Sequence, residues 1–369
     1  YQLNDSYTSK PYDRFDDWQF KTAFIDLNGD ITLSGIEHKL LIGANSLDYY
    51  YGQLKTSGES IDYIPGLIDP VRPDISYTTD DSLYTSEYDY YGIYFQDLMT
   101  LNEQWQVAVG GRYDKQKKEN ADNESFLPKI GVLYHPIENA TIYVNYSEGF
   151  EPQRSETIND DRDKNDGLSI DAVTSEQIEM GAKWQVSDRL LLNAAIFNIE
   201  KTGTLISEQL IDDPLYDTAT TQSGLQKHQG FEFSAQGTIT DKLFLITSVM
   251  YLDATYEQDE KYEGNTPVDA PKLSASAWSR YELTEKFALN AGVFYQGERY
   301  ADNANTVSKD AYSRIDIGAT YQASILGNKV DLRLNVENVL DKNYIAGGGM
   351  NNVTIGNGAT ARFEIKTAL

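Results

Sequence analysis

Three successive stretches alternate apolar and polar residues: Phe287-Ala-Leu-Asn-Ala-Gly-Val-Phe-Tyr-Gln296, Arg314-Ile-Asp-Ile-Gly-Ala-Thr-Tyr-Gln322 and Val330-Asp-Leu-Arg-Leu-Asn-Val-Glu337. A period of two residues places each set on its own face of a β-sheet. The polar set contains too many charged side chains to form a packed interior. The region between Lys286 and Leu340 therefore predicts a sheet with one apolar face and one wet face.

The composition of the chain limits the class of protein, and with it which face of the sheet can be turned outward. The chain has 369 residues, no cysteine, a net charge of -26, and an aromatic load of 27 Tyr and 13 Phe. It contains no run approaching the roughly 20 apolar residues of a transmembrane helix. Phosphate contacts need clustered Lys and Arg, so the negative charge argues against nucleic-acid binding.

Strand length and aromatic content favour a membrane barrel over a soluble β-protein. The stretches suggest strands of about 12 residues, longer than the usual 5 to 6 of globular sheets. Transmembrane β-strands alternate apolar-out with polar-in and carry girdles of aromatic residues. Slipping the last stretch by one residue would expose Asp331, Arg333 and Glu337 to lipid, and a basic side chain there costs about 2 to 4 kcal/mol. The fold class predicted is therefore all-β, an antiparallel transmembrane β-barrel with the charged set lining its lumen.

The remainder of the chain repeats this unit, with about fifteen strands expected. They are expected near residues 13–27, 36–55, 84–100, 104–118, 126–135, 140–149, 174–186, 189–202, 225–238, 242–256, 271–283, 286–300, 311–323, 329–345 and 359–369.

The connections between these strands are predicted to alternate strictly between short and long. The short ones are Thr100 to Gln104, Pro136 to Ala140, Ser187 to Asp188, Thr240 to Asp241 and Thr284 to Glu285, with a slightly longer one opened by Asn28-Gly29. The long ones are Ser57 to Leu83, Glu119 to Ser125, Phe150 to Val173, Gly203 to Gly224, Glu257 to Ala270, Ala301 to Asp310 and Ala346 to Gly358. Outer-membrane barrels have short periplasmic turns and longer extracellular loops, so all long loops are expected at the extracellular end.

An odd number of strands would leave an open edge. Bacterial single-chain barrels close with an even number of strands, and an unpaired edge is not tolerated in hydrocarbon. We therefore expect that residue 1 is not the true start of the protein. The first residues do not resemble a signal peptide.

Three motifs add a specific resemblance. Tyr143-Val-Asn-Tyr-Ser-Glu-Gly-Phe-Glu-Pro152, followed by Ser175-Glu-Gln-Ile-Glu-Met-Gly-Ala-Lys183, resembles successive strands of TonB-dependent siderophore receptors. Gln229-Gly-Phe-Glu-Phe233 is similar to a later strand of that family, and Asn335-Val-Glu-Asn-Val-Leu-Asp-Lys-Asn-Tyr344 to its penultimate-strand motif. The order and spacing agree over nearly all of the chain.

The resemblance implies a 22-stranded barrel whose lumen is filled by an N-terminal plug. Residues 1–369 would form one partial barrel domain, the eighth to the twenty-second strand, without the plug and about seven strands. The implied protein is a monomer of the Gram-negative outer membrane, surrounded by lipid and lipopolysaccharide. It would bind a ferric siderophore and import it with energy from the TonB-ExbB-ExbD complex, with which the plug makes contact. The resemblance implies transport rather than catalysis, and no cofactor besides the transported ferric complex.

Two segments are most similar to the ferric-hydroxamate branch of the family. They are Gly297-Glu-Arg-Tyr-Ala-Asp-Asn-Ala-Asn305 and Tyr344-Ile-Ala-Gly with the Gly-rich loop that follows. The family usually ends in Phe, whereas this chain ends in Leu369.

Strand phase and height select candidate contacts for the siderophore. Iron-siderophore complexes carry apolar and carbonyl surfaces, which suit aromatic walls with a few polar donors. The inward-facing candidates at the extracellular rim are Tyr84, Tyr88, Tyr90, Tyr300 and Tyr312, with Arg154 beside the GFxP motif as a partner for an anionic ligand. The alternative for each rim tyrosine is packing against the plug or a loop.

Other groups of residues carry weaker signals. Asp161, Asp163 and Asn165 resemble the first ligands of a calcium loop, but Gly167 stands at position seven and Ala172 replaces the terminal Glu. A flexible acidic loop is favoured over a calcium site. The histidines, His38, His135 and His228, are far apart in sequence and form no evident hydrolase pair with a serine.

The sequence leaves two functions from different classes open. One is an energy-dependent siderophore receptor, which the motifs favour, and the other is a passive diffusion porin with a charged lumen. An outer-membrane enzyme is a third and weaker alternative.

Overall fold

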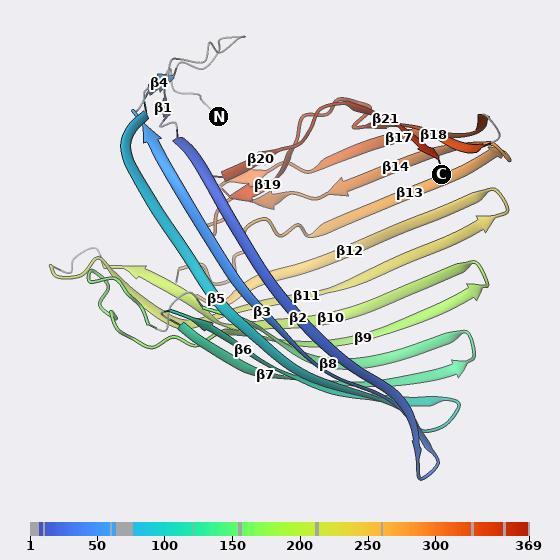
Figure 1. Ribbon diagram of the computed structural model, residues 1–369, viewed down its shortest axis with the longest axis horizontal. Helices are drawn as coiled ribbons and strands as arrows, with labels where there is room; N and C mark the ends of the chain where they lie inside the picture. Colours follow the sequence, from blue (N-terminus) through green and yellow to red (C-terminus); the bar gives the residue numbers. More distant parts are fainter. Residues whose placement is uncertain are drawn as a thin grey trace.

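A computed structural model describes residues 7–9, 12–59, 61–63, 77–119, 121–153, 157–210, 214–259, 261–325, 328–349 and 352–367. Fifteen strands form one antiparallel sheet in the order β2-β3-β5-β6-β7-β8-β9-β10-β11-β12-β13-β14-β17-β18-β21. The sheet is strongly curved, and its first and last strands, β2 and β21, lie at its two edges (Figure 1). None of the described residues belongs to a helix long and apolar enough to cross a lipid bilayer.

The strands of the sheet follow one another in sequence order. They are β2 (Tyr12–Leu33), β3 (Ile36–Gly58), β5 (Tyr77–Thr100), β6 (Trp105–Lys118), β7 (Ala121–Ile137), β8 (Ala140–Glu151), β9 (Val173–Ser187), β10 (Leu190–Gln209), β11 (Thr218–Thr240), β12 (Leu243–Gln258), β13 (Leu273–Thr284), β14 (Phe287–Gln296), β17 (Tyr312–Ile325), β18 (Asn328–Glu337) and β21 (Thr360–Thr367). Each pairs antiparallel with its neighbours, which confirms the predicted number of strands and their order.

Three short two-stranded sheets stand outside the large sheet. They pair β1 (Tyr7–Ser9) with β4 (Ile61–Tyr63), β15 (Arg299–Tyr300) with β16 (Ser308–Lys309), and β19 (Ile345–Gly349) with β20 (Asn352–Ile355). We call the end of the sheet that carries the connections β8–β9, β12–β13, β14–β17 and β18–β21 the loop end, and the opposite end the turn end.

Three predicted connections are wrong because the strands continue past them. The loop expected from Gly203 to Gly224 is mostly strand, since β10 runs to Gln209 and β11 begins at Thr218. The turn expected at Asn28-Gly29 lies instead at Ser34 and Gly35, which have φ angles of 52° and 85°. The loop expected from Glu119 to Ser125 is mostly strand, since β7 pairs with β6 from Ala121 onward. The connections therefore do not alternate strictly between short and long, although the expected chain direction holds.

Two predicted strands end early. The strand expected over 286–300 leaves the sheet after Gln296, because Arg299 and Tyr300 pair with Lys309 and Ser308 in the β15–β16 hairpin.

The strand expected over 329–345 ends at Glu337, where Asn338 adopts a φ of 51° and is only 1% exposed. The Asn338 side-chain amide donates to the carbonyls of Lys342 and Asn357, both at 2.9 Å. Asp341 has a φ of 50°, and its carboxylate accepts from the Ala359 N–H at 2.8 Å. The penultimate-strand motif therefore builds a turn at its Asn and Asp rather than a longer strand.

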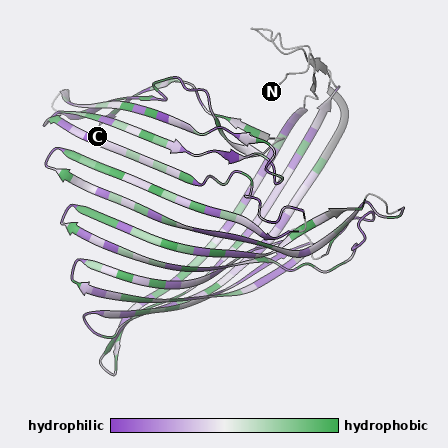
Figure 2. Ribbon diagram, turned by 180° about the vertical axis from the view of Figure 1, so that it is seen from behind, coloured by the Kyte–Doolittle hydropathy of each residue, from purple (hydrophilic) through white to green (hydrophobic). Residues whose placement is uncertain are grey.

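The register assigns the two faces. Ile93, Ile196 and Val293 share the outer face with other large apolar residues, and they are 62%, 58% and 45% exposed. Apolar and polar residues alternate along the strands (Figure 2). Exposing so large an apolar surface to water would be unfavourable. The surface has the character of the lipid-facing apolar band of an outer-membrane barrel.

Aromatic side chains mark both borders of this apolar face. Near the turn end, Trp105 and Tyr134 pair across β6 and β7 with ring centroids 4.6 Å apart. Toward the loop end, Phe231 and Tyr251 stack with centroids 6.2 Å apart. These positions match the two aromatic girdles of transmembrane barrels.

The inner face is polar, and two glycines let large side chains lie flat along it. A Cβ atom on Gly43 would lie 2.4 Å from the ring of Tyr94, and one on Gly181 would lie 2.5 Å from the ring of Tyr143. Tyr143 is held there by a hydrogen bond from its hydroxyl to Glu179 at 2.7 Å. The inner face therefore forms a surface of ordered aromatic and charged groups.

The face assignment predicts that neighbouring residues of β10 respond differently to the same change. Ile196→Arg, on the outer face, should lower the free energy of unfolding in a bilayer by about 2 to 4 kcal/mol, since lipid cannot solvate the guanidinium. Ala195→Arg, on the inner face opposite Glu232, should cost much less. Urea titration in lipid vesicles measures both, and an equal loss for the two variants would contradict the assignment.

Candidate ligand-binding site

Six aromatic side chains form a surface on the inner face at the loop end, across β2, β3 and β5. We call this group the aromatic wall; it consists of Trp18, Phe20, Tyr49, Tyr51, Tyr84 and Tyr88. The strands continue beyond the apolar band here, and their two-residue period keeps every second side chain on the inner face.

The wall is arranged as two ladders. In one, Trp18 stacks on Tyr51 at 5.5 Å between ring centroids, and Tyr84 meets Tyr51 edge-on at 6.1 Å. In the other, Tyr49 lies 5.5 Å from Phe20 and stacks on Tyr88 at 4.5 Å. Trp18, Phe20 and Tyr84 are 55%, 63% and 55% exposed, so the ladders present ring surface to the lumen.

An arginine lies just below the wall. The Arg112 Nε donates to Asp114 at 2.7 Å and its Nη2 donates to Asn45 at 2.8 Å. The guanidinium also lies 5.1 Å from the ring centroid of Tyr94 and 5.9 Å from that of Tyr90. Asp114 is only 2% exposed, so a buried carboxylate holds the Arg112 guanidinium in place beside Tyr90, beneath the wall.

A hollow of about 680 Å³ continues from Arg112 along the inner wall. Tyr94, Tyr143 and Glu179 are among the residues that line it. Its volume lies within the range of small-molecule sites, about 300 to 1,000 Å³.

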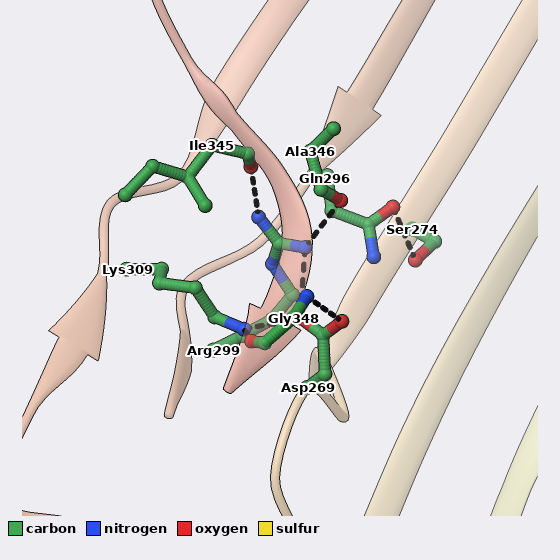
Figure 3. A network of polar contacts seen from close by, with 8 residues as sticks. All are labelled: Asp269, Ser274, Gln296, Arg299, Lys309, Ile345, Ala346 and Gly348. Carbon is green, nitrogen blue, oxygen red and sulfur yellow. Dashed lines mark hydrogen bonds and ion pairs between the residues drawn. The ribbon is translucent and has the colours of Figure 1, made fainter. Parts of the chain in front are cut away.

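A second group ties together three loops at the loop end, far along the sheet from the aromatic wall. We call Asp269, Arg299 and Lys309 the loop anchor (Figure 3). Arg299 and Lys309 donate to the same Asp269 oxygen, at 3.0 and 2.5 Å. Both cationic side chains are 2% exposed.

Backbone groups complete the anchor. Arg299 donates to the carbonyls of Ile345 and Ala346 at 2.6 and 2.9 Å, and Lys309 donates to that of Gly348. The Gly348 N–H in turn donates to Asp269 at 3.1 Å. The anchor therefore joins the β12–β13 loop, the β15–β16 hairpin and the strand β19.

The pKa of Asp269 is lowered from its ordinary value. Burial alone would raise the pKa, but the hydrogen bonds from Lys309 and Gly348 and the charges of Lys309 and Arg299 outweigh it. Asp269 is therefore ionised over a wider pH range than a free aspartate, which keeps the anchor closed.

A third contact pins the β8–β9 loop. Asp163 is 2% exposed and accepts from the Thr220 N–H and hydroxyl at 3.0 and 2.6 Å, the Thr218 hydroxyl at 2.9 Å and the Asn165 N–H at 2.8 Å. Burial alone would raise its pKa, but these hydrogen bonds together lower the pKa to about 2. The carboxylate holds the loop onto β11, which corrects the expectation of a flexible acidic loop.

No metal site is found in the part of the chain that the structure describes. Within those ranges, no group of three or more His, Cys, Asp or Glu side chains is arranged to hold a metal ion. Asp163, the central residue of the calcium-like pattern, has its oxygens engaged by hydrogen bonds within the protein.

The predicted contact residues fall into separate places. Tyr84 and Tyr88 belong to the aromatic wall, and Tyr90 lies directly below it. Tyr312 faces inward beside the loop anchor, stacked on Tyr344 at 4.2 Å and 5.6 Å from the Arg299 guanidinium.

The other two predicted contacts are Tyr300 and Arg154. Tyr300 lies on the β15–β16 hairpin rather than on β14, and its carbonyl accepts from the Asp269 N–H at 3.0 Å. Arg154 lies outside the described residues.

Sequence reasoning missed Trp18, Phe20, Tyr49 and Tyr51. The run Tyr49-Tyr50-Tyr51 hides the phase, since consecutive tyrosines point to opposite faces. Only the register against β5, in which Tyr49 faces Tyr88, reveals which of them are inward.

Comparison with known proteins agrees with this architecture. The family described as "TonB dependent receptor-like, beta-barrel" matches residues 1–339. The chain belongs to this family of TonB-dependent receptor barrels. As a TonB-dependent receptor barrel, it is a component of the Gram-negative outer membrane, and its family consists of receptors rather than enzymes.

Relatives of this TonB-dependent receptor barrel include two curated proteins. The chain is 29% identical over 354 residues to the ferrioxamine receptor of Yersinia enterocolitica. It is 27% identical over 364 residues to the ferrichrome outer membrane transporter/phage receptor of Escherichia coli (strain K12). The alignments cover 87% and 90% of this chain but 46% of each relative, so the chain spans about half of their length.

Solved structures share the fold. The siderophore receptor PiuA from Acinetobacter baumannii superposes with a TM-score of 0.77 at 24% identity, covering 95% of this chain and 56% of that one. The ferric preacinetobactin receptor BauA from the same species gives 0.81 at 19% identity, covering 98% and 56%. These structures and the two relatives are receptors, not the diffusion porins of the alternative hypothesis.

Removing the single carboxylate of the loop anchor should destabilise the three loops that the anchor joins. Asp269→Asn leaves two buried cations without a counter-charge and should destabilise the three joined loops by about 3 kcal/mol, a low value for a buried pair because Asp269 is 34% exposed. Hydrogen exchange should become faster in the β12–β13 loop, β15–β16 and β19 together. The exposed Glu298→Gln is the control, and unchanged exchange in Asp269→Asn would contradict the anchor.

The β8–β9 loop should respond to acid. A depressed pKa stabilises the fold fully above the ordinary value of about 4 and loses that effect as the pH falls through the folded value of about 2. Pepsin should therefore cut the loop slowly at pH 4 and faster at pH 2. Asp163→Asn should be cut rapidly at both values, whereas Asp161→Asn should behave like the wild type; equal protection of all three at pH 4 would refute the role of Asp163.

Proposed function

We propose that the protein is an outer-membrane receptor that binds a ferric siderophore at the loop end and imports it with energy from the TonB-ExbB-ExbD complex. The observation that carries the proposal is the aromatic wall, which presents exposed rings to the lumen at the loop end of a TonB-dependent receptor barrel.

The wall has the chemistry that such a ligand needs. Iron-siderophore complexes are bulky and present aliphatic and carbonyl surface, which packs on ring faces and accepts hydrogen bonds from phenol groups. The inward phase and height of Tyr84, Tyr88 and Tyr90 make them the first contacts in this proposal. Arg154, Tyr300 and Tyr312 remain predicted contacts at the rim.

Two curated relatives support the ligand class that we propose. They are named for ferrioxamine and ferrichrome, and the segments 297–305 and 344–347 of this chain are similar to the ferric-hydroxamate branch. We extend that class to this protein as part of the proposal. Its remaining partners are lipid and lipopolysaccharide around the outer face, and we expect the receptor to act as a monomer without enzyme activity.

A matched pair of substitutions on β5 tests the wall. In the full-length protein, the double variant Tyr84→Ala with Tyr88→Ala should weaken binding of a ferric hydroxamate about 10-fold or more, because two ring contacts are lost. Tyr91→Ala, on the outer face of the same strand, should bind like the wild type. Fluorescence titration with ferrichrome and ferrioxamine B, and then with ferric catecholates, measures the effect. An unchanged affinity in the double variant would remove the wall from the site, and a wild-type protein that binds none of these complexes would refute the proposed function.

A further inference from the structure

The loop end of the sheet has a step between β5 and β6. β6 ends at Lys118, which pairs with Tyr88. β5 continues beyond this pair as far as Tyr77, with β3 as its partner. Above the step, β5 therefore has a strand neighbour on one side only (Figure 1). Its free side faces β6 and not the edge of the sheet at β2.

The alternation of the backbone shows which groups are free. Directly after β5, the Leu101 N–H donates to the Trp105 carbonyl at 3.0 Å, so the odd-numbered residues of β5 direct their N–H and C=O groups toward β6. The register has no shift from Leu83 onward. The backbone groups of Leu83, Thr85 and Glu87 therefore point to the free side, where no described residue bonds to them.

Other strands that extend past a neighbour at this end are closed by the protein itself. The β8–β9 loop covers β11, since the Lys164 N–H donates to the Thr218 carbonyl at 2.7 Å. The loop after β12 covers that strand, where the Tyr256 N–H donates to the Asn265 carbonyl at 3.0 Å. Side-chain hydrogen bonds of Asn123 close β7, and register shifts interrupt β10. Among the described residues, the free part of β5 has neither a covering segment nor a register shift.

Such an edge accepts another β-strand. Free N–H and C=O groups recur about every 7 Å along it, and an extended polypeptide carries matching groups at the same spacing. The edge also lies outside the apolar band, because the outward side chains of Glu87 and Asp89 are charged and exposed. A polypeptide arriving from the extracellular side can therefore reach it through water.

Exposed apolar side chains flank the edge on both faces of the sheet. On the outer face, Phe15, Leu54 and Leu83 lie side by side across β2, β3 and β5, and all three are exposed. On the inner face, Tyr84 is an exposed member of the aromatic wall. A strand added to β5 would place successive side chains beside Leu83 and Tyr84 in turn, so apolar contacts form on both faces.

The charges at the step favour a basic partner. A hollow of about 660 Å³ lies there. Its charged lining residues are Asp48, Glu87, Asp89, Lys117, Lys118 and Glu119. Acidic side chains outnumber basic ones in this lining, and the whole chain has a net charge of -26. Lys and Arg side chains of a partner would therefore be attracted to the step.

We infer that the free edge of β5 binds an extended, basic segment of a polypeptide, which joins the sheet as a further strand. The inference goes beyond the proposed function, because this binding requires neither iron nor uptake. The row of free backbone groups selects a polypeptide over a small molecule, and the acidic step selects its charge.

A single proline tests the role of the backbone. The probe is a capped, fluorescein-labelled peptide of about ten residues in which Lys and Val alternate, and the full-length receptor is held in lipid nanodiscs. Thr85→Pro removes the central free N–H and leaves the bonds to β3 in place, so it should bind the peptide at least about 10-fold more weakly than Thr85→Ala, which keeps that N–H. Fluorescence anisotropy measures both affinities. Equal affinity of the two variants would overturn the inference.

Two control peptides separate strand addition from adsorption by charge. The same peptide with N-methyl groups on its central amides keeps its charge but cannot pair along the edge, and the same peptide with Glu in place of Lys keeps its backbone but reverses its charge. Both should bind the wild type at least about 10-fold more weakly than the probe. An N-methylated peptide that binds as tightly as the probe would contradict strand addition, and a Glu peptide that does so would contradict the basic partner.

Hydrogen exchange in the wild-type receptor gives a test without any substitution. The amides of Leu83, Thr85 and Glu87 should exchange fast in the receptor alone, and the probe should slow them at least about 10-fold. Slow exchange of these amides without the peptide would show that the receptor itself covers the edge, and it would overturn the inference. Exchange that stays fast when the peptide is bound would overturn it as well.

Discussion

The structure depends on the pairing register of its strands. In lipid, every backbone N–H and C=O must find a partner within the protein, so each strand has to pair with its neighbours over its full span. Side chains alternate with a period of two, and a slip of one residue would exchange the inner and outer faces of a strand. Between β9 and β10, for example, the register places Met180 beside Ile196 on the outer face and Glu179 beside Phe197 on the inner face. The apolar band, the polar lumen and the direction of every loop follow from this one constraint.

The same constraint explains how binding groups are positioned. Strands that continue past the apolar band carry their alternation with them, so Trp18, Tyr51 and Tyr84 lie in one ladder without a helix or a long loop to hold them. On the other side of the sheet, the strands stop and loops take over. There the side chains of Arg299 and Lys309 hold Asp269, and carbonyls of Ile345 and Ala346 complete the contact. Rigid aromatic strands and anchored loops thus border the same lumen.

The two-residue alternation of the sequence predicts the strands and the faces of their side chains. It does not predict features that depend on contacts between residues far apart in sequence. The fifteen strands, their order and the inward phase of Tyr84, Tyr88 and Tyr90 follow from alternation alone. The strand ends do not follow from alternation, because β14 stops where Arg299 pairs with Lys309 in the β15–β16 hairpin rather than with a neighbouring strand of the sheet. The loop anchor joins Asp269 to Arg299 and Lys309, which are 30 and 40 positions away in sequence. No local sequence pattern predicts a contact over such a separation.

Iron uptake with and without an energy source tests the central claim most directly. Cells that carry the full-length receptor should accumulate radiolabelled iron from a ferric hydroxamate, with saturation at low ligand concentration. A proton ionophore, or loss of the TonB protein, should abolish accumulation while surface binding persists, because transport through a TonB-dependent receptor draws on energy supplied from outside the barrel. Uptake that continues without energy and rises in proportion to ligand concentration would contradict the account and would indicate passive diffusion.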